Sequence, residues 1–539
     1  MNWLANPIFR RYCRSRLRPN GLIAWLLVTL VLTGFTFFLA RLSAMHRGGV
    51  LSVDAERMAI FPLMVIQGII LFFLGTGQVA GGITGEADEG VLDYQRLSPL
   101  TPVQKMLGYL FGLPVREWLL FFSTMPFSLW CFVQGKVPFA AWGSVYLIFI
   151  SSAILYHLTG LTAGLVIRNK RWAFLSSMAM ILLLYTVMPQ VAKMGLLFFD
   201  YLTIWPVLDE NLPSMLPRVT GEVVRVVQLF SKKVSLFNLQ FSELVFTLFC
   251  QGGMLLALGT MVCRRWRRAE SHLLGKSGAA LLFVWLQTFL LGNALPLIKE
   301  GDVFPSKSFA FVLRNNKTYE PDFSEGLFVI IAYGVVTMVL LLALVYMITP
   351  AADVQLRGIR RAKKLGLPRV PIATDAASAW MWAMAMLSAG AVAWYLFAER
   401  ILASDWFPDH TLPWYGLLAF WVVLLNAVMI FHAIVEGWGN RAIFLFGLFV
   451  GVVPLLLSFV VGVVADGWLT TSVWLGSLSP WSGAVLAPPV VIPGAELPSS
   501  VARAVPRAFY FCQCIMLIVN GVLWIKLRQK LQQRSAIAT

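Results

Sequence analysis

Residues 327–348 read LFVIIAYGVVTMVLLLALVYMI and contain no Asp, Glu, Lys or Arg. A helix of about 20 apolar residues is long enough to cross the hydrocarbon core of a bilayer, which is roughly 30 Å thick. Within lipid a single segment satisfies its own backbone hydrogen bonds only as a helix. The stretch therefore predicts a membrane-spanning helix near residues 326–349.

The whole chain has the composition of a membrane protein. Its 539 residues are 58% hydrophobic and 13% charged, whereas a soluble chain carries about 25% charged residues. A core of finite size cannot bury so much apolar surface, so lipid must cover the rest. The net charge of +17 indicates basic cytoplasmic loops, and no nucleic-acid partner is expected. The six cysteines form no C-x-x-C pair and are expected to be free thiols.

The same length rule predicts an all-α polytopic integral membrane protein with about twelve transmembrane helices. The first apolar run lacks a convincing signal-peptide cleavage site, so we expect it to be retained as a span. Most of the 43 Lys and Arg residues fall on the side of the N-terminus, which predicts that both termini are cytoplasmic. The spans are expected near 21–40, 58–80, 117–134, 139–167, 172–199, 241–263, 277–298, 326–349, 377–398, 412–435, 442–465 and 508–525.

A basic amphipathic helix is predicted just before the first span. Asn6 is a favourable N-cap, and Pro7 suits the first helical position. One side of this helix would hold the apolar residues Leu4, Ala5, Ile8, Phe9 and Tyr12. The opposite side would hold Arg10, Arg11, Arg14 and Arg18, whereas Arg16 fits neither side. Such a helix is expected at the cytoplasmic membrane interface. The alternative is a positively charged flank with no further role.

The loop after the second span, residues 81–102, reads GGITGEADEGVLDYQRLSPLTP. It is assigned to the cytoplasmic side, yet it is acidic as far as Asp93. Helical spacing predicts that Glu86, Glu89 and Asp93 share one face of a short helix that the two following prolines end. Such a helix suits docking onto a basic groove of a soluble partner. An acidic solvated loop is the alternative.

Both segments together resemble the type-2 ABC transporter permeases, over about residues 1–265. The resemblance rests on Asn6-Pro7-Ile8, on the basic run that ends Arg16-Leu17-Arg18, and on Ile83-Thr84-Gly85-Glu86, Gly90-Val91-Leu92-Asp93, Leu97-Ser98-Pro99-Leu100-Thr101 and Gly108. It implies an interfacial elbow helix that includes Asn6, Pro7, Arg10, Arg11, Arg14 and Arg18. It also implies a coupling helix for the nucleotide-binding subunit, with Glu86, Glu89, Gly90, Leu92, Asp93, Arg96 and Leu97. The chain departs from the family pattern at Tyr12, where Glu is frequent, at Val91, where Thr is usual, and at Tyr109, where Lys is usual.

The resemblance implies a permease subunit of an ATP-driven exporter in the bacterial inner (plasma) membrane. A separate ABC ATPase would bind ATP and Mg²⁺, so no catalytic, cofactor-binding or metal-binding residue is expected in this chain. Membrane lipids, and either a second permease or a second copy of the chain, are the other expected partners. The sequence Gly275-Lys276-Ser277 matches only the end of a phosphate-binding loop, because Glu270 stands where that loop needs glycine.

Arg264–Arg268 divides the chain into a predicted six-span permease unit, residues 1–270, and a second six-span bundle, residues 271–539. The second bundle is either a diverged permease unit or an accessory bundle. Two longer outer stretches are expected near 200–240 and 299–325. The first includes an amphipathic run, Val219–Phe237, that is expected on the outer membrane surface. The second includes the glycosylation sequon Asn316-Lys317-Thr318, a common chance match.

Two other functions are alternatives, a membrane-embedded lipid or glycan transferase and an ion-coupled secondary transporter. A transferase needs polar residues that converge in the spans or a long catalytic loop, and this chain has few such features. His432 and Glu436 are one helical turn apart and suit a metal pair, a proton relay or a satisfied helix-end pair. His157 lies within the fourth span, and Lys193 and Glu243 lie near the outer ends of the fifth and sixth. A secondary transporter needs acidic residues in mid-span, where this chain has few.

Overall fold

The computed structural model describes most of the chain, namely residues 6–46, 52–193, 195–217, 233–299, 323–404, 411–464, 468–493, 495, 497 and 499–537. Leu4, Ala5, the sequon at 316–318 and most of the predicted outer amphipathic run, 219–232, lie outside these ranges. By its contacts the chain divides into two compact units, and the main boundary lies between Ala269 and Glu270. Each unit is described by itself.

Eleven helices among the described residues are long and apolar enough to cross a membrane. The protein is therefore an all-α polytopic membrane protein. The remaining predicted span, 117–134, is the helix α8 (Val115–Gln134). Its 20 residues would reach about 30 Å, but α8 is not among the eleven helices. The structure thus gives eleven candidate spans among the described residues, against the expected count of about twelve.

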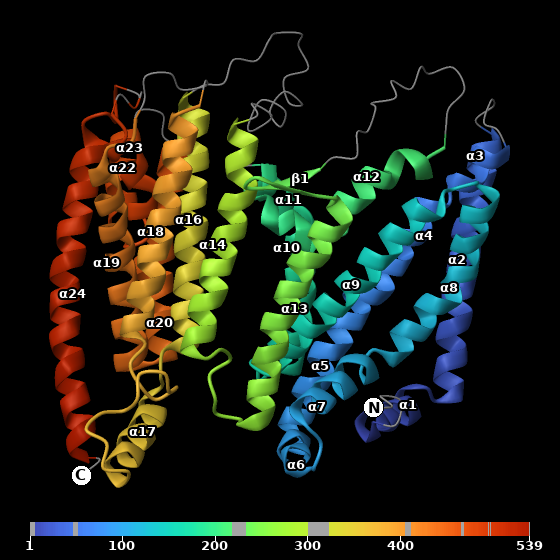
Figure 1. Cartoon of the computed structure of the whole chain (residues 1–539), viewed down its shortest axis with the longest axis horizontal. Helices are drawn as coiled ribbons and strands as arrows, with labels where there is room; N and C mark the ends of the chain where they lie inside the picture. The colour runs from blue at the N-terminus through green and yellow to red at the C-terminus, as the bar shows by residue number, and fades with distance from the viewer. Residues whose placement is uncertain are drawn as a thin grey trace. The chain divides into compact units, whose positions relative to one another are not determined.

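Unit 1 carries two short helices at one end, α1 and α6, and two others, α3 and α12, at the opposite end (Figure 1). Within it, α5 packs against α9 and α10, α13 packs against α9 and α7, α2 packs against α8, and α1 packs against α7. Its helices are α1 (Pro7–Arg16), α2 (Pro19–His46), α3 (Ser52–Arg57), α4 (Ile60–Gly68), η2 (Ile69–Gly75), α5 (Thr76–Asp88), α6 (Val91–Leu97), α7 (Pro102–Gly112), α8, α9 (Phe139–Gly164), α10 (Lys170–Thr186), α11 (Met188–Lys193), η3 (Leu197–Leu202), α12 (Trp205–Met215) and α13 (Glu243–Arg267).

The second span is much longer than the sequence predicted. The candidate span covers Val53–Asp88, 36 residues. After a turn that follows α3, one continuous helix runs from Ile60 to Asp88, because the π-helical segment η2 joins α4 to α5. At 1.5 Å per residue this helix is about 43 Å long, so its end must project beyond a hydrocarbon core of roughly 30 Å. The first part of the predicted acidic loop is therefore the projecting end of a membrane helix.

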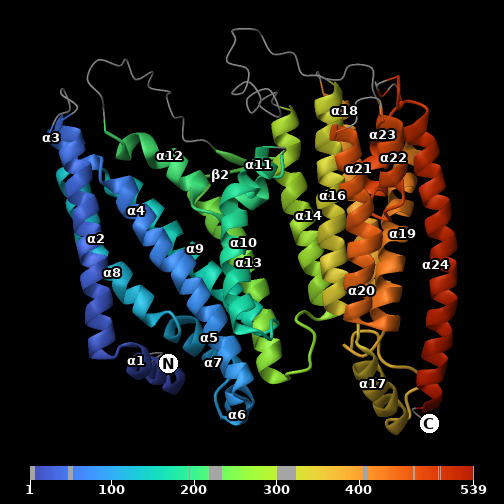
Figure 2. The same ribbon diagram turned by 180° about the vertical axis from the view of Figure 1, so that it is seen from behind.

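Unit 2 is a second helical bundle, which Figure 2 shows from the side opposite to Figure 1. Here α14 packs against α18, α18 packs against α16 and α19, and α24 packs against α19. Its helices are α14 (Lys276–Lys299), α16 (Phe323–Ile348), α17 (Ala352–Lys364), α18 (Trp380–Leu402), α19 (Trp414–Trp438), α20 (Asn440–Phe446), η4 (Gly447–Val452), α21 (Val453–Val464), α22 (Leu469–Ser477), α23 (Gly483–Val491) and α24 (Ala504–Ile537). The strands β1 (Val234–Leu236) and β2 (Leu239–Phe241) form a two-stranded sheet, and all of it except Leu236 belongs to unit 1.

Buried polar side chains join the spans within unit 1. The Gln67 amide donates to Thr124 Oγ1 and to Ser128 Oγ, each at 3.0 Å, and its carbonyl oxygen accepts from Tyr146 Oη at 2.6 Å. All four side chains are buried. Lipid supplies no hydrogen-bonding alternative, so side-chain pairs of this kind hold membrane helices together.

Candidate functional site

The predicted acidic helix is two helices with a break at Gly90. The first, α5, ends at Asp88, and Glu89 is its C-cap. Gly90 has a left-handed φ of 73° and begins α6, a conformation that glycine adopts without the steric cost that a Cβ brings. The expectation that Glu86, Glu89 and Asp93 share one helical face was therefore wrong, because a left-handed residue changes the direction of the chain between them. The predicted end of the helix is confirmed, since α6 stops at Leu97, directly before Ser98-Pro99.

Glu86 points into the protein rather than toward solvent. Its side chain is only 12% exposed and forms an ion pair with Arg11. Tyr12 Oη donates to Glu86 Oε1, and Tyr109 Oη donates to Glu86 Oε2 at 2.5 Å. Arg11 and Tyr12 belong to α1, and Tyr109 belongs to α7. One carboxylate therefore joins α5 to both helices. The expectation that Glu86 belongs to the exposed face that docks onto a soluble partner does not hold.

Two of the three positions at which the chain departs from the family pattern are these tyrosines. Their rings meet edge to face with centroids 5.7 Å apart, and Tyr109 also stacks on Trp266 of α13 at 5.1 Å. Burial raises the pKa of Tyr12 to about 12, although Arg11 acts in the opposite direction. Burial, followed by the effect of Tyr12, also raises the pKa of Tyr109 well above its usual range. Both hydroxyls are therefore protonated near neutral pH and able to donate to Glu86.

The packing of α1 on α7 depends on a cap and two glycines. Asn6 Oδ1 accepts from the backbone N–H of Ile8 at 3.0 Å, and Asn6 Nδ2 donates to the backbone carbonyl oxygen of Gln104 at 2.7 Å. Asn6 thus caps α1 as predicted and also anchors it to α7. A Cβ on Gly108 would lie 2.9 Å from Ile8 Cβ, and a Cβ on Gly112 would lie 2.9 Å from Tyr12 Cδ2. Both glycines are needed because the two helices approach so closely.

The amphipathic pattern predicted for α1 is confirmed for the described residues. Ile8 and Tyr12 are buried, whereas Pro7, Arg10, Arg11, Arg14 and Arg18 are exposed. Arg16, which fitted neither side, donates from Nη1 to Gln78 Oε1 of α5 at 2.9 Å. The apolar side of α1 is thus covered by protein.

The tip of unit 1, formed by Asp88, Glu89, Asp93, Tyr94 and Leu97, is the exposed part of the predicted coupling segment. Tyr94 is 75% exposed and Leu97 is 85% exposed. These exposed fractions are high for large, mainly apolar side chains. The same short segment carries the three exposed carboxylates. Asp93 pairs with Arg96 within α6. Leu92 is the buried member of the segment.

Lys105 is a structural residue that the sequence analysis did not identify. Its Nζ donates to the carbonyl oxygens of Arg96 and Ser98, each at 3.2 Å, so it caps the C-terminal end of α6 from α7. Burial, followed by the effect of Arg96, lowers the pKa of Lys105. No local pattern in the sequence singles out this lysine.

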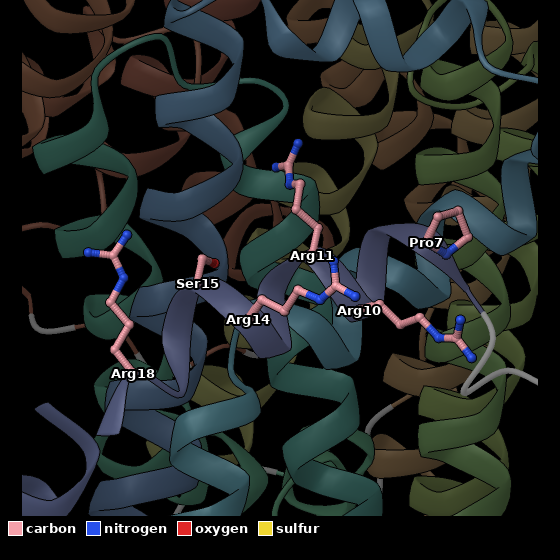
Figure 3. A pocket seen from close by; sticks show the side chains of 6 residues that line it. All are labelled: Pro7, Arg10, Arg11, Arg14, Ser15 and Arg18. Atoms are coloured by element: carbon pink, nitrogen blue, oxygen red, sulfur yellow. The ribbon is translucent and has the colours of Figure 1, made fainter. Parts of the chain in front are cut away.

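The exposed side of α1 is hollowed. Pro7, Arg10, Arg11, Arg14, Ser15 and Arg18 line an open depression of about 480 Å³ (Figure 3). Four of the six lining residues are arginines, so four guanidinium groups lie around the depression. Arg11 belongs both to this hollow and to the ion pair with Glu86.

His432 and Glu436 are joined within a buried polar network of unit 2. His432 Nε2 lies 2.7 Å from Glu436 Oε2. Ser378 Oγ lies 3.1 Å from the same carboxylate, and Gln355 Nε2 donates to its other oxygen at 2.7 Å. Arg534 Nη1 donates to Gln355 Oε1 at 2.7 Å. The described part of the chain holds no group of three or more His, Cys, Asp or Glu residues placed to bind a metal ion. These contacts match the interpretation of His432 and Glu436 as a helix-end pair whose hydrogen bonds are satisfied within the protein.

The other ionisable candidates have structural partners where their side chains are described. His157 Nε2 donates to Leu71 O in η2 at 2.9 Å, which satisfies a carbonyl in the π-helical segment. Lys276 of the Gly-Lys-Ser sequence is buried and donates to the carbonyl oxygens of Thr374, at 2.7 Å, and Ala377. Glu243 lies in the first turn of α13 and is buried. The side chain of Lys193 lies outside the described residues.

No protein-family model matches this chain, and no curated protein or solved structure matches it.

Proposed function

We propose that the chain is the transmembrane permease subunit of an ATP-driven exporter, coupled to a separate ABC-type ATPase subunit. The main support is the tip of unit 1, where Tyr94 and Leu97 are exposed on the same short segment as the exposed carboxylates Asp88, Glu89 and Asp93. A contiguous apolar patch with a polar rim marks an interaction site, and in this proposal Tyr94 and Leu97 form the apolar part of such a patch. The partner surface that fits the tip is a groove with apolar walls and a basic rim.

The attachment of the tip suits the transmission of movement. It follows directly on α5, the projecting end of a continuous helix that begins at Ile60. Glu86 ties that helix end to α1 and α7, and Lys105 ties α6 to α7. A push on α6 would therefore reach α5 and α7 together instead of bending a loose loop. In this proposal ATP and Mg²⁺ bind to the partner, and the bundle alternates between inward- and outward-facing states.

The test uses co-purification of the full chain with its ATPase subunit and the ATPase activity that the chain stimulates. We expect Glu89→Lys with Asp93→Lys to reduce both, because the charges that face the basic rim are reversed. The association of the unaltered proteins should also weaken as salt concentration rises.

Asp209→Lys is the matched control, since Asp209 is an exposed carboxylate of α12, at the opposite end of unit 1 (Figure 1). This control should leave association unchanged. Unaltered binding and unaltered stimulation in the Glu89/Asp93 variant would refute the docking role of the tip.

A further inference from the structure

The hollow on α1 gathers positive charge beside a helix that faces lipid. Arg10, Arg11, Arg14 and Arg18 line it with Pro7 and Ser15 (Figure 3). Guanidinium groups bind phosphate oxygens through paired, charge-assisted hydrogen bonds. The lining therefore suits an anion with several oxygen atoms, such as a phosphodiester.

The neighbouring span identifies the source of that phosphodiester. After Arg18 the chain enters α2, of which only 11% is buried within the protein. Leu27 is 57% exposed, Val31 is 70% exposed and Phe35 is 61% exposed. In a membrane these side chains contact acyl chains. A lipid whose acyl chains lie along α2 would bring its phosphate to the level of α1, at the membrane surface.

We propose that the α1 hollow binds the headgroup of an anionic phospholipid, and that Arg11 is shared between this headgroup and Glu86. The Arg11 side chain is 42% exposed, lines the hollow and also pairs with Glu86. A bound headgroup competes with Glu86 for this guanidinium group. The lipid thereby loosens the junction of α1, α5 and α7, whether or not a motor protein binds α6.

Native mass spectrometry of the detergent-solubilised full chain, titrated with dioleoyl phosphatidylglycerol, tests the site. Phosphatidylcholine, which has no net charge, and soluble glycerol 3-phosphate are the comparison ligands. We expect phosphatidylglycerol to bind more tightly than either. The variant Arg14→Gln with Arg18→Gln should weaken this binding by about 25-fold, at about fivefold for each basic residue near an anionic surface.

Lys363→Gln with Lys364→Gln is the matched control, because it removes two exposed charges from α17. An equal loss of phosphatidylglycerol binding in both double variants would overturn the proposal, since it would show attraction to any basic surface. Equal binding of phosphatidylcholine would also overturn it. Tight binding of glycerol 3-phosphate would show that the hollow takes a free phosphate rather than a lipid.

The sharing of Arg11 has its own readout. Glu86→Gln releases Arg11 and should tighten phosphatidylglycerol binding, whereas Glu89→Gln removes the same charge from an exposed residue of the tip. A gain in Glu86→Gln that exceeds the gain in Glu89→Gln supports the shared guanidinium group. Equal effects of the two variants would refute it.

Discussion

Replacing Tyr109 with Phe removes one of the two hydroxyls that bind Glu86 and leaves the packing of the ring in place. Tyr109 is fully buried and its hydroxyl lies 2.5 Å from Glu86 Oε2. A hydrogen bond to a charged group contributes about 1.5–3 kcal/mol, because the buried acceptor is left unsatisfied when the donor is removed. The lost hydrogen bond joins α7 to α5, so the free energy that holds α7 against α5 should fall by about this amount.

The effect is best measured as amide hydrogen exchange of α7, residues 102–112, in the full-length protein. Exchange through local opening reports the free energy of that opening. A loss of about 1.5–3 kcal/mol corresponds to exchange that is faster by about 10- to 150-fold. Exchange in α24, which belongs to the other unit, should not change.

Tyr94→Phe is the control, since Tyr94 is 75% exposed and its hydroxyl contributes nothing to this junction. It should leave the exchange of α7 unaltered. If Tyr109→Phe also leaves α7 exchange unaltered, Glu86 does not hold α7 against α5, and the account of force transmission through this carboxylate fails.

Three further predictions concern the same end of unit 1. Gly108→Val should destabilise the contact of α1 with α7 by about 1–3 kcal/mol, because even a Cβ would lie 2.9 Å from Ile8 Cβ; faster exchange in α1 would show this. Lys105→Met should increase exchange in α6 and leave α1 docked, since the lysine binds the carbonyl oxygens of Arg96 and Ser98. Tyr12 has its pKa raised by burial from 10.0 to about 12, so its protonated form contributes stability that is complete below pH 10 and is lost as the pH rises toward 12. Spectroscopic titration should show α1 loosening in that range, and Tyr12→Phe should remove the contribution of this group.

Much of the fold could be predicted because the membrane acts as a uniform solvent. A run such as residues 327–348 has to be helical and lipid-embedded whatever its neighbours are, since lipid satisfies no backbone hydrogen bond. Local stereochemistry was equally predictable: Asn6 caps α1, and the prolines after Leu97 end α6. The hydrophobic pattern did not reveal that the second span continues to Asp88, because its projecting end is polar.

The amino-acid sequence by itself determined the class of the protein, the approximate positions of its spans, the amphipathic α1 and the acidic character of the segment before α6. Only the tertiary structure decided which carboxylates are exposed. Helical spacing placed Glu86 on one face with Glu89 and Asp93, but Gly90 interrupts the helix. The partners of Glu86 are Arg11 and Tyr12, and Tyr12 precedes Glu86 by 74 residues in the chain. A local pattern encodes the periodicity of one element, whereas the partner of a buried charge is set by elements that meet only after the chain has folded.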